Sequence, residues 1–108
     1  MLHKNLEDKN WFKLDIYQQM ANIGAEVGRA LKWQRKNKEY SQMAFYRALE
    51  LLFLTINDKK NKKRLKELTR IYEILVDYFY GENLLKTDKE FLERYFNCFN
   101  FALANKNG

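Results

Sequence analysis

The residue types that most often carry enzyme chemistry are scarce in this sequence. The 108 residues include one histidine, His3, and one cysteine, Cys98. Di-metal chemistry on a helical bundle needs a Glu-x-x-His pair from each of two helices, and an activated serine or cysteine needs a base such as histidine. We expect Cys98, which has Phe96 and Phe99 as close neighbours in sequence, to pack inertly in a core. Because a glycine-rich phosphate loop and a zinc-ligand spacing are also absent, the sequence predicts a protein that is not an enzyme, with no metal and no cofactor.

Basic residues are the remaining candidates for a binding site, and they form two clusters. The formal net charge of +6 favours encounters with polyanions such as nucleic acid, and free N–H groups at a helix start also attract anions. We therefore expect the clusters to contact phosphate groups. The first cluster consists of Lys59, Lys60, Lys62, Lys63, Arg64 and Lys66, and the second of Lys32, Arg35 and Lys36. The alternative for the first cluster is a loop whose charge serves only solubility.

Hydrophobic periodicity places both clusters at helix ends. The segments in which apolar residues recur at spacings of three and four are 10–36, 40–57, 62–80 and the residues that follow Thr87. The connections between them are short, and short connections make consecutive helices antiparallel neighbours. We predict an all-α protein, a single antiparallel up-down-up-down four-helix bundle that forms one domain over residues 1–108, with residues 1–9 as a flexible N-terminus. In such a bundle the two basic clusters lie at opposite ends.

Several residues are expected to begin or end these helices. Thr87 and Glu90 have the spacing of a capping box, in which each side chain bonds the backbone N–H of the other. Asparagine, aspartate and serine favour helix ends because their side chains satisfy free backbone N–H groups, and glycine tolerates the left-handed conformation after a helix. The other residues expected at helix ends are Asp8 or Asn10 at the first start, Asn37 at the first end, Ser41 at the second start and Gly81 at the third end.

The helix expected over residues 40–57 is apolar on nearly all sides, and one bundle core does not bury every side of a helix. We expect the surplus to form an interface between copies of the chain, because large exposed apolar patches are rare on monomers. The expected interface residues are Phe45, Leu49, Leu51, Phe53 and Leu54. The alternative is that neighbouring aromatic side chains cover this surface.

Two glycines, Gly24 and Gly28, lie one turn apart on the first expected helix. Glycine inside a helix costs about 1 kcal/mol relative to alanine, so the pair indicates the close approach of another helix. We favour a contact inside the bundle over a contact between chains. The polar side of the same helix is interpreted as a solvated face made of Asp15, Gln18, Gln19, Asn22, Glu26 and Arg29. The alternative is that Asn22, Glu26 and Arg29 form a recognition surface, or that they pair with Arg47 and Glu50 of the next expected helix.

Two consecutive segments cover most of the chain: YQQMANIGAEVGRALKWQRKNKEYSQMAFYRALELLFLTI and NKKRLKELTRIYEILVDYFYGEN. Together they resemble a group of short uncharacterised prokaryotic helical proteins. This resemblance implies no activity and no site residues. In architecture alone the chain is similar to the four-helix proteins encoded in ribosomal RNA intervening sequences and to the accessory subunits of diversity-generating retroelements, which implies an oligomer and, for the second group, contact with nucleic acid and a reverse transcriptase. It is also similar to HEPN nuclease bundles, but the Arg-x(4 to 6)-His motif of that family is absent.

The sequence also limits the compartment and the partners. No stretch approaches the roughly 20 apolar residues that span a bilayer, and the N-terminus lacks a signal-peptide pattern. A single cysteine fits a reducing compartment, so we expect a cytoplasmic protein with no membrane contact. We predict a non-enzymatic, self-associating helical adaptor whose basic ends contact nucleic acid. The alternative is a protein-interaction module, such as the partner of a toxin or transferase, with no nucleic-acid role.

Overall fold

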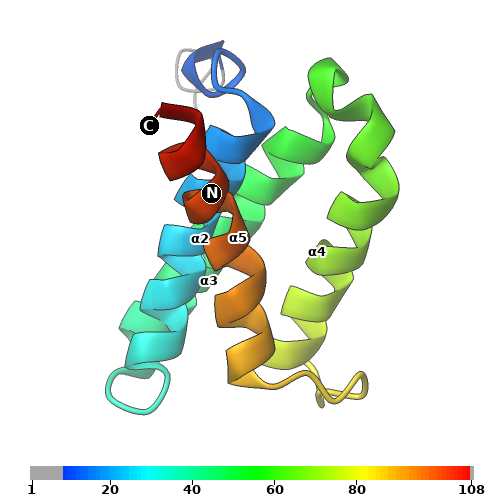
Figure 1. The fold of residues 1–108 in the computed structure, drawn as a ribbon. Helices are drawn as coiled ribbons and strands as arrows, with labels where there is room; N and C mark the ends of the chain where they lie inside the picture. The colour runs from blue at the N-terminus through cyan, green and yellow to red at the C-terminus, as the bar shows by residue number, and fades with distance from the viewer. Residues whose placement is uncertain (1–8, 108) are drawn as a thin grey trace.

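Helices make up most of the computed structural model, which describes residues 9–107 (Figure 1). Its long helices are α2 (Ile16–Trp33), α3 (Lys38–Ile56), α4 (Leu65–Phe79) and α5 (Lys89–Asn107), with a 3₁₀ helix, η1 (Lys59–Arg64), between α3 and α4. No strand occurs among the described residues, which confirms the all-α prediction. Residues 1–8 of the expected flexible N-terminus lie outside the described part of the chain.

The long helices alternate in direction along one axis of the molecule (Figure 1). Helix α2 packs against both α3 and α5, and α4 packs against α3. A link between α4 and α5 comes from side chains, because the Tyr95 hydroxyl donates to the Glu67 carboxylate at 2.7 Å. Arg64 forms an ion pair with the same carboxylate at 3.3 Å. Helix α2 therefore lies at the centre of the arrangement, and α4 is joined to the rest mainly through α3.

Helix α2 begins later than the periodicity predicts. Asp15 caps it: its Oδ1 accepts from the backbone N–H of Gln18 at 2.9 Å, and Gln18 Oε1 accepts from the N–H of Asp15 at 3.0 Å. Asn10 was an expected cap, but the structure has Asp15 in that role. Asp8, the other expected cap, lies outside the described residues. Residues 9–14 form a separate segment that turns before α2 and brings Trp11 into the core with 8% of its surface exposed.

At the turn between α2 and α3, Asn37 and Ser41 have roles that differ from the expected ones. Asn37 does not end the first helix but caps the second, because its Oδ1 accepts from the N–H of Tyr40 at 3.2 Å. Ser41 is buried inside α3, where its hydroxyl donates to the carbonyl oxygen of Ala30 at 2.7 Å. A serine that satisfies a buried carbonyl of the neighbouring helix is not free to cap its own.

The ends of α4 and α5 also differ from the expected positions. Helix α4 ends at Phe79, and Gly81 does not adopt the left-handed conformation; the positive φ angles belong to Asn83 (52°) and Lys86 (54°). Asp88, not Thr87, receives the N–H of Phe91, at 2.8 Å. Thr87 instead bonds through its backbone to the side chain of Asn83, so the Thr87–Glu90 capping box is not formed. Asparagine tolerates the left-handed region because its short polar side chain bonds locally, as Asn83 does here.

The core is built from apolar side chains of all four long helices and from Trp11. Apolar side chains that the periodicity placed on inward faces, including Met20, Ile23, Leu52 and Leu75, have no exposed surface. Leu92 of α5 is buried to the same extent. The spacing of apolar residues therefore predicted the inward faces correctly even where helix ends were misplaced.

Gly24 marks a very close approach between α2 and α5. A Cβ atom added at Gly24 would lie 2.8 Å from the Cβ of Phe96, whereas one added at Gly28 would have no atom within 4 Å. The expected contact inside the bundle is confirmed at Gly24 and is not made at Gly28. Cys98 is exposed, which corrects its expected burial: Phe96 and Phe99 occupy the inward face of α5, and Cys98 lies on another side of the helix.

The apolar surplus of α3 is partly covered by the chain itself. Phe45 and Leu51 are 2% and 6% exposed and belong to the core, which removes them from the expected interface between copies. Leu49 and Leu54 are half-buried against that core. Phe53 is the one member of the expected set with an exposed side chain, at 57%. The expected interface was too wide because both α2 and α4 pack against α3.

Candidate nucleic-acid interface

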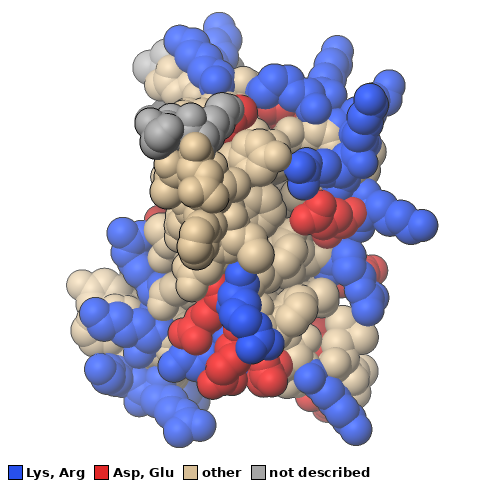
Figure 2. Space-filling model, in the orientation of Figure 1, with Lys and Arg blue, Asp and Glu red and all other residues tan. Residues whose placement is uncertain are grey.

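The first basic cluster lies at the turn from α3 into α4, and we call residues 59–66 the lysine corner. Figure 2 shows Lys and Arg side chains gathered over this region, at the upper right. The sequence of η1 is KKNKKR, a run of like charges that has no apolar residue to pack. Asp58 begins η1, because its Oδ1 accepts from the N–H of Lys60 at 3.0 Å. Further stabilisation of the η1 backbone must come from contacts with the residues beneath the lysine corner.

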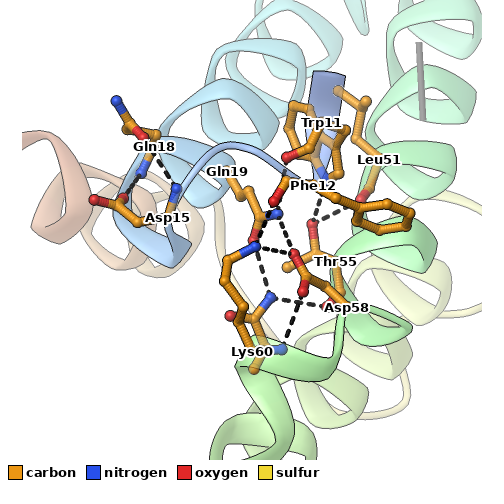
Figure 3. Close-up of polar contacts among 10 residues, drawn as sticks. Trp11, Phe12, Asp15, Gln18, Gln19, Leu51, Thr55, Asp58 and Lys60 are labelled. Atoms are coloured by element: carbon orange, nitrogen blue, oxygen red, sulfur yellow. Dashed lines mark hydrogen bonds and ion pairs between the residues drawn. The ribbon is translucent and has the colours of Figure 1, made fainter. Parts of the chain in front are cut away.

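A buried polar network supplies those contacts (Figure 3). Asn61 Nδ2 donates to Gln19 Oε1 at 2.9 Å and to the carbonyl oxygen of Thr55 at 3.0 Å. Gln19 Nε2 donates to Asp58 Oδ2 at 2.9 Å, and Trp11 Nε1 donates to Thr55 Oγ1 at 3.0 Å. Each of these polar side chains is buried and has hydrogen-bond partners, as buried polar groups require. The network fastens the lysine corner to α2, to α3 and to the segment before α2.

Asp58 is the charged member of the network. Burial alone raises the pKa of the Asp58 carboxyl, but hydrogen bonds from Lys60 and Gln19 outweigh burial and hold the pKa below its usual value. Lys60 Nζ lies 2.6 Å from Asp58 Oδ2 and donates to the carbonyl oxygen of Phe12 at 2.6 Å. The charge of Lys60 is therefore compensated by Asp58, although the Lys60 side chain is exposed, and this lysine contributes to the fold.

The other cations of the lysine corner differ in whether they have an acidic partner. Arg64 is half-buried: it pairs with Glu67 and its guanidinium lies 5.7 Å from the centre of the Tyr17 ring. The remaining members are exposed and form no ion pair within the described residues. These four lysines are Lys59, Lys62, Lys63 and Lys66. Positive charge without an acidic partner, displayed on a fixed backbone, is what a phosphate group would meet here.

The second basic cluster lies at the other end of the molecule, around the turn between α2 and α3, at the lower left in Figure 2. Lys32, Arg35 and Lys36 are all exposed there. The two clusters stand at opposite ends of α3, whose 19 residues span about 28 Å. Acidic side chains near the start of α5 lie between them in this view. On this face the two clusters are therefore separated by acidic side chains.

The sequence analysis missed the buried network and wrongly assigned Gln19 to the solvated face of its helix, whereas the structure buries Gln19 completely. Gln19 carried a signal, because it lies between Ile16 and Ile23 on the apolar face of α2, at spacings of three and four. A polar residue on an apolar face needs a buried hydrogen-bond partner. Its partners come from residues 58 and 61, which only the folded chain brings near.

Other kinds of site find no support between residues 9 and 107. No group of three His, Cys, Asp or Glu side chains is placed to hold a metal ion in that part of the chain. Within the same range, none of the helices has the length and apolar character required to cross a membrane.

Comparison with known proteins adds no assignment. No protein-family model, curated protein or solved structure matches this chain. The likenesses drawn from the sequence therefore remain predictions, and the two basic clusters are the features from which a function can be proposed.

Proposed function

We propose that this chain is a non-enzymatic nucleic-acid-binding protein that contacts phosphate groups through the lysine corner, in a cytoplasmic setting. The observation that carries the proposal is the set of exposed lysines without acidic partners on a backbone held by buried hydrogen bonds. The alternating directions of α2, α3, α4 and α5 support an up-down-up-down four-helix bundle as the scaffold. The absence of a catalytic constellation in the sequence supports a binding role over an enzymatic one.

The lysine corner is organised before a ligand arrives, because buried hydrogen bonds hold its backbone. Bringing like charges together is unfavourable, and here the network of Asp58, Asn61 and Gln19 stabilises the backbone that displays them. A phosphate backbone that binds these lysines releases condensed counterions, which favours association at low salt. Little further ordering of the backbone of residues 59–64 is needed on binding, so less of the binding free energy is lost.

The test is the salt dependence of binding to a labelled duplex and a labelled single strand. The variant replaces four lysines by glutamine and retains Lys60, whose loss would disturb the fold: Lys59→Gln, Lys62→Gln, Lys63→Gln and Lys66→Gln. The matched control removes the same number of positive charges from α4, α5 and the loop between them: Arg70→Gln, Lys86→Gln, Lys89→Gln and Arg94→Gln. Both variants have the same formal net charge, so they separate a local site from a general effect of charge.

Each phosphate contact contributes a slope of roughly −0.9 on duplex DNA, or −0.7 on a single strand, to a plot of log affinity against log salt. We expect the lysine-corner variant to flatten the slope by about 3, and the control to change it by less than about 1. Equal changes of the slope in both variants would show that binding depends on net charge and not on a local site. An unchanged slope in the lysine-corner variant would rule out phosphate binding at this site.

A second candidate function, self-association, is favoured by an exposed stripe on α3. Met43, Tyr46 and Phe53 are 65%, 45% and 57% exposed and lie at spacings that place them on neighbouring positions of one helix side. Burial of such a stripe against a second copy would stabilise a dimer through the hydrophobic effect. Light scattering coupled to size exclusion tests this candidate: a dimer that Phe53→Ser converts to a monomer supports it, and a monomeric wild type contradicts it.

A further inference from the structure

The turn between α2 and α3 combines an exposed aromatic ring with several cations. The ring centres of Trp33 and Tyr40 are 5.4 Å apart, with their planes inclined at 49°. The Nζ atoms of Lys32 and Lys36 lie 5.8 and 5.9 Å from the centre of the Trp33 ring. Trp33 is half-buried, whereas Tyr40 is 56% exposed. An open aromatic surface is therefore bordered by ammonium groups, and Arg35 adds a guanidinium to the same turn.

Hydrogen bonds fix the backbone that carries both rings. The N–H of Asn37 donates to the carbonyl oxygen of Trp33 at 2.8 Å, and Asn37 Oδ1 accepts from the N–H of Tyr40 at 3.2 Å. One residue further along α3, the Ser41 hydroxyl donates to Ala30 of α2 at 2.7 Å. The Trp33 ring supports one side of Tyr40. A planar ligand can therefore stack on Tyr40 without first ordering the turn.

The chemistry of this surface selects among polyanions. In a duplex the faces of the bases are already stacked, so a duplex offers phosphate groups but no free base to Tyr40. An unpaired base offers its face beside its own phosphate, which matches an aromatic ring flanked by cations. An apolar protein partner fits less well, because it would remove water from Lys32, Arg35 and Lys36 without compensating their charge.

We propose that the turn between α2 and α3 stacks an unpaired base on Tyr40 and binds the adjacent phosphates through Lys32 and Lys36, so that the chain prefers single-stranded nucleic acid. This inference rests on the proposed function, because the phosphate contacts at the lysine corner supply affinity for both strands and duplexes. Single-stranded RNA and DNA share the recognised chemistry, and the test uses both.

The experiment measures the affinity of the full chain for labelled oligothymidine and oligouridine of about ten nucleotides, and for a duplex of the same length. Tyr40→Leu removes the stacking ring, and Phe101→Leu is the control, because Phe101 is 72% exposed and has no cation over its ring in the described structure. We expect Tyr40→Leu to weaken single-strand binding roughly tenfold, the effect of losing one stacked base, and to leave duplex binding within about twofold. We expect Phe101→Leu to match the wild type.

Tryptophan fluorescence gives an independent measurement. The chain has two tryptophans, and Trp11 is 8% exposed in the core, so emission that responds to a bound strand comes from Trp33. We expect the single strands to quench this emission at saturation and the duplex to leave it nearly unchanged. The same titration of Trp11→Phe, with folding checked by circular dichroism and excitation at a wavelength that tyrosine does not absorb, leaves Trp33 as the one tryptophan that emits.

The outcomes separate this inference from the proposed function. If strand and duplex bind equally, with the salt slope set by the lysine corner and no effect of Tyr40→Leu, the proposed function stands and base stacking is overturned. Equal losses in Tyr40→Leu and Phe101→Leu also overturn it. If neither strand nor duplex binds at low salt, both proposals are overturned.

Discussion

The same substitution is expected to have opposite effects at two positions one turn apart on α2. Gly24→Ala places a methyl group 2.8 Å from the Cβ of Phe96 and 3.2 Å from its Cγ. Gly28→Ala places a methyl group where no atom lies within 4 Å. The two variants share the helix, the side-chain change and the change in backbone freedom, so the difference between them isolates the contact between α2 and α5.

The size of each effect follows from the geometry. Alanine stabilises a helix interior by about 1 kcal/mol relative to glycine, so Gly28→Ala should raise the free energy of unfolding by up to about that amount. At Gly24 the same gain is opposed by overlap with the Cβ of Phe96, an atom attached directly to the backbone. Relief requires α5 to move away from α2, and such overpacking costs about 1–3 kcal/mol. We expect Gly24→Ala to lower the free energy of unfolding by up to about 2 kcal/mol.

Urea unfolding followed by circular dichroism measures both variants against the wild type. A difference of about 1 kcal/mol shifts the melting temperature of a domain this size by roughly 4 °C or more, so thermal unfolding provides a second measurement. A Gly24→Ala variant as stable as Gly28→Ala would refute the close approach of α2 and α5 at this point. If Gly28→Ala is no more stable than the wild type, helix propensity does not determine the stability at that exposed position.

Three further predictions concern the network, the link between α4 and α5, and the exposed cysteine. Because the pKa of Asp58 is lower in the folded chain than in the unfolded chain, its stabilising effect is complete above about pH 4 and is lost as pH falls through the folded pKa. We expect Asp58→Asn to lower the free energy of unfolding by about 2–4 kcal/mol near neutral pH and to weaken its dependence on acid pH. Urea unfolding across a pH series measures both effects. An unaltered pH profile would show that Asp58 does not cause the acid dependence. Tyr95→Phe removes the 2.7 Å hydrogen bond to the Glu67 carboxylate and should cost about 1 kcal/mol in chemical unfolding. Tyr46→Phe removes a longer bond, at 3.3 Å, to the neutral hydroxyl of Tyr80 and should cost less than about half of that; equal costs would show that the link to Glu67 has no special weight. Cys98 should react with a thiol reagent in the native state as fast as in urea, and strong protection under native conditions would place it in a covered site.

The inward faces of the helices were predictable from sequence, whereas the helix ends were not. The spacing of Ile23 and Leu52 within their segments depends only on helix geometry and the burial of apolar residues. The ends depend on competition between neighbouring polar residues. Asn37 caps α3 and Ser41 does not, because Ser41 already bonds a carbonyl of α2. A contact of that kind is decided by tertiary structure and leaves no local mark in the sequence.

The basic clusters were predictable as exposed charge, but the different role of Lys60 was not. Lys59 and Lys62 have the same local sequence character as Lys60 and remain exposed without acidic partners in the described chain. Lys60 differs because Asp58 and the carbonyl oxygen of Phe12 lie within its reach in the folded chain. Tyr40 was likewise recognisable in sequence only as a member of an apolar helix, and its position beside Trp33 comes from the tight turn between α2 and α3.

The polar network beneath the lysine corner also has a consequence for folding order. Its hydrogen bonds join residues far apart in the chain: Gln19 and Asn61 are 42 positions apart, Trp11 and Thr55 are 44, and Phe12 and Lys60 are 48. Closing such long loops costs entropy that is recovered only after α2 and α3 have paired. We therefore expect residues 59–64 to become ordered late in folding, and to open and close together with the segment before α2 as one cooperative unit. A ligand bound to the ordered corner stabilises that segment too, and so slows hydrogen exchange at amides on the far side of the network.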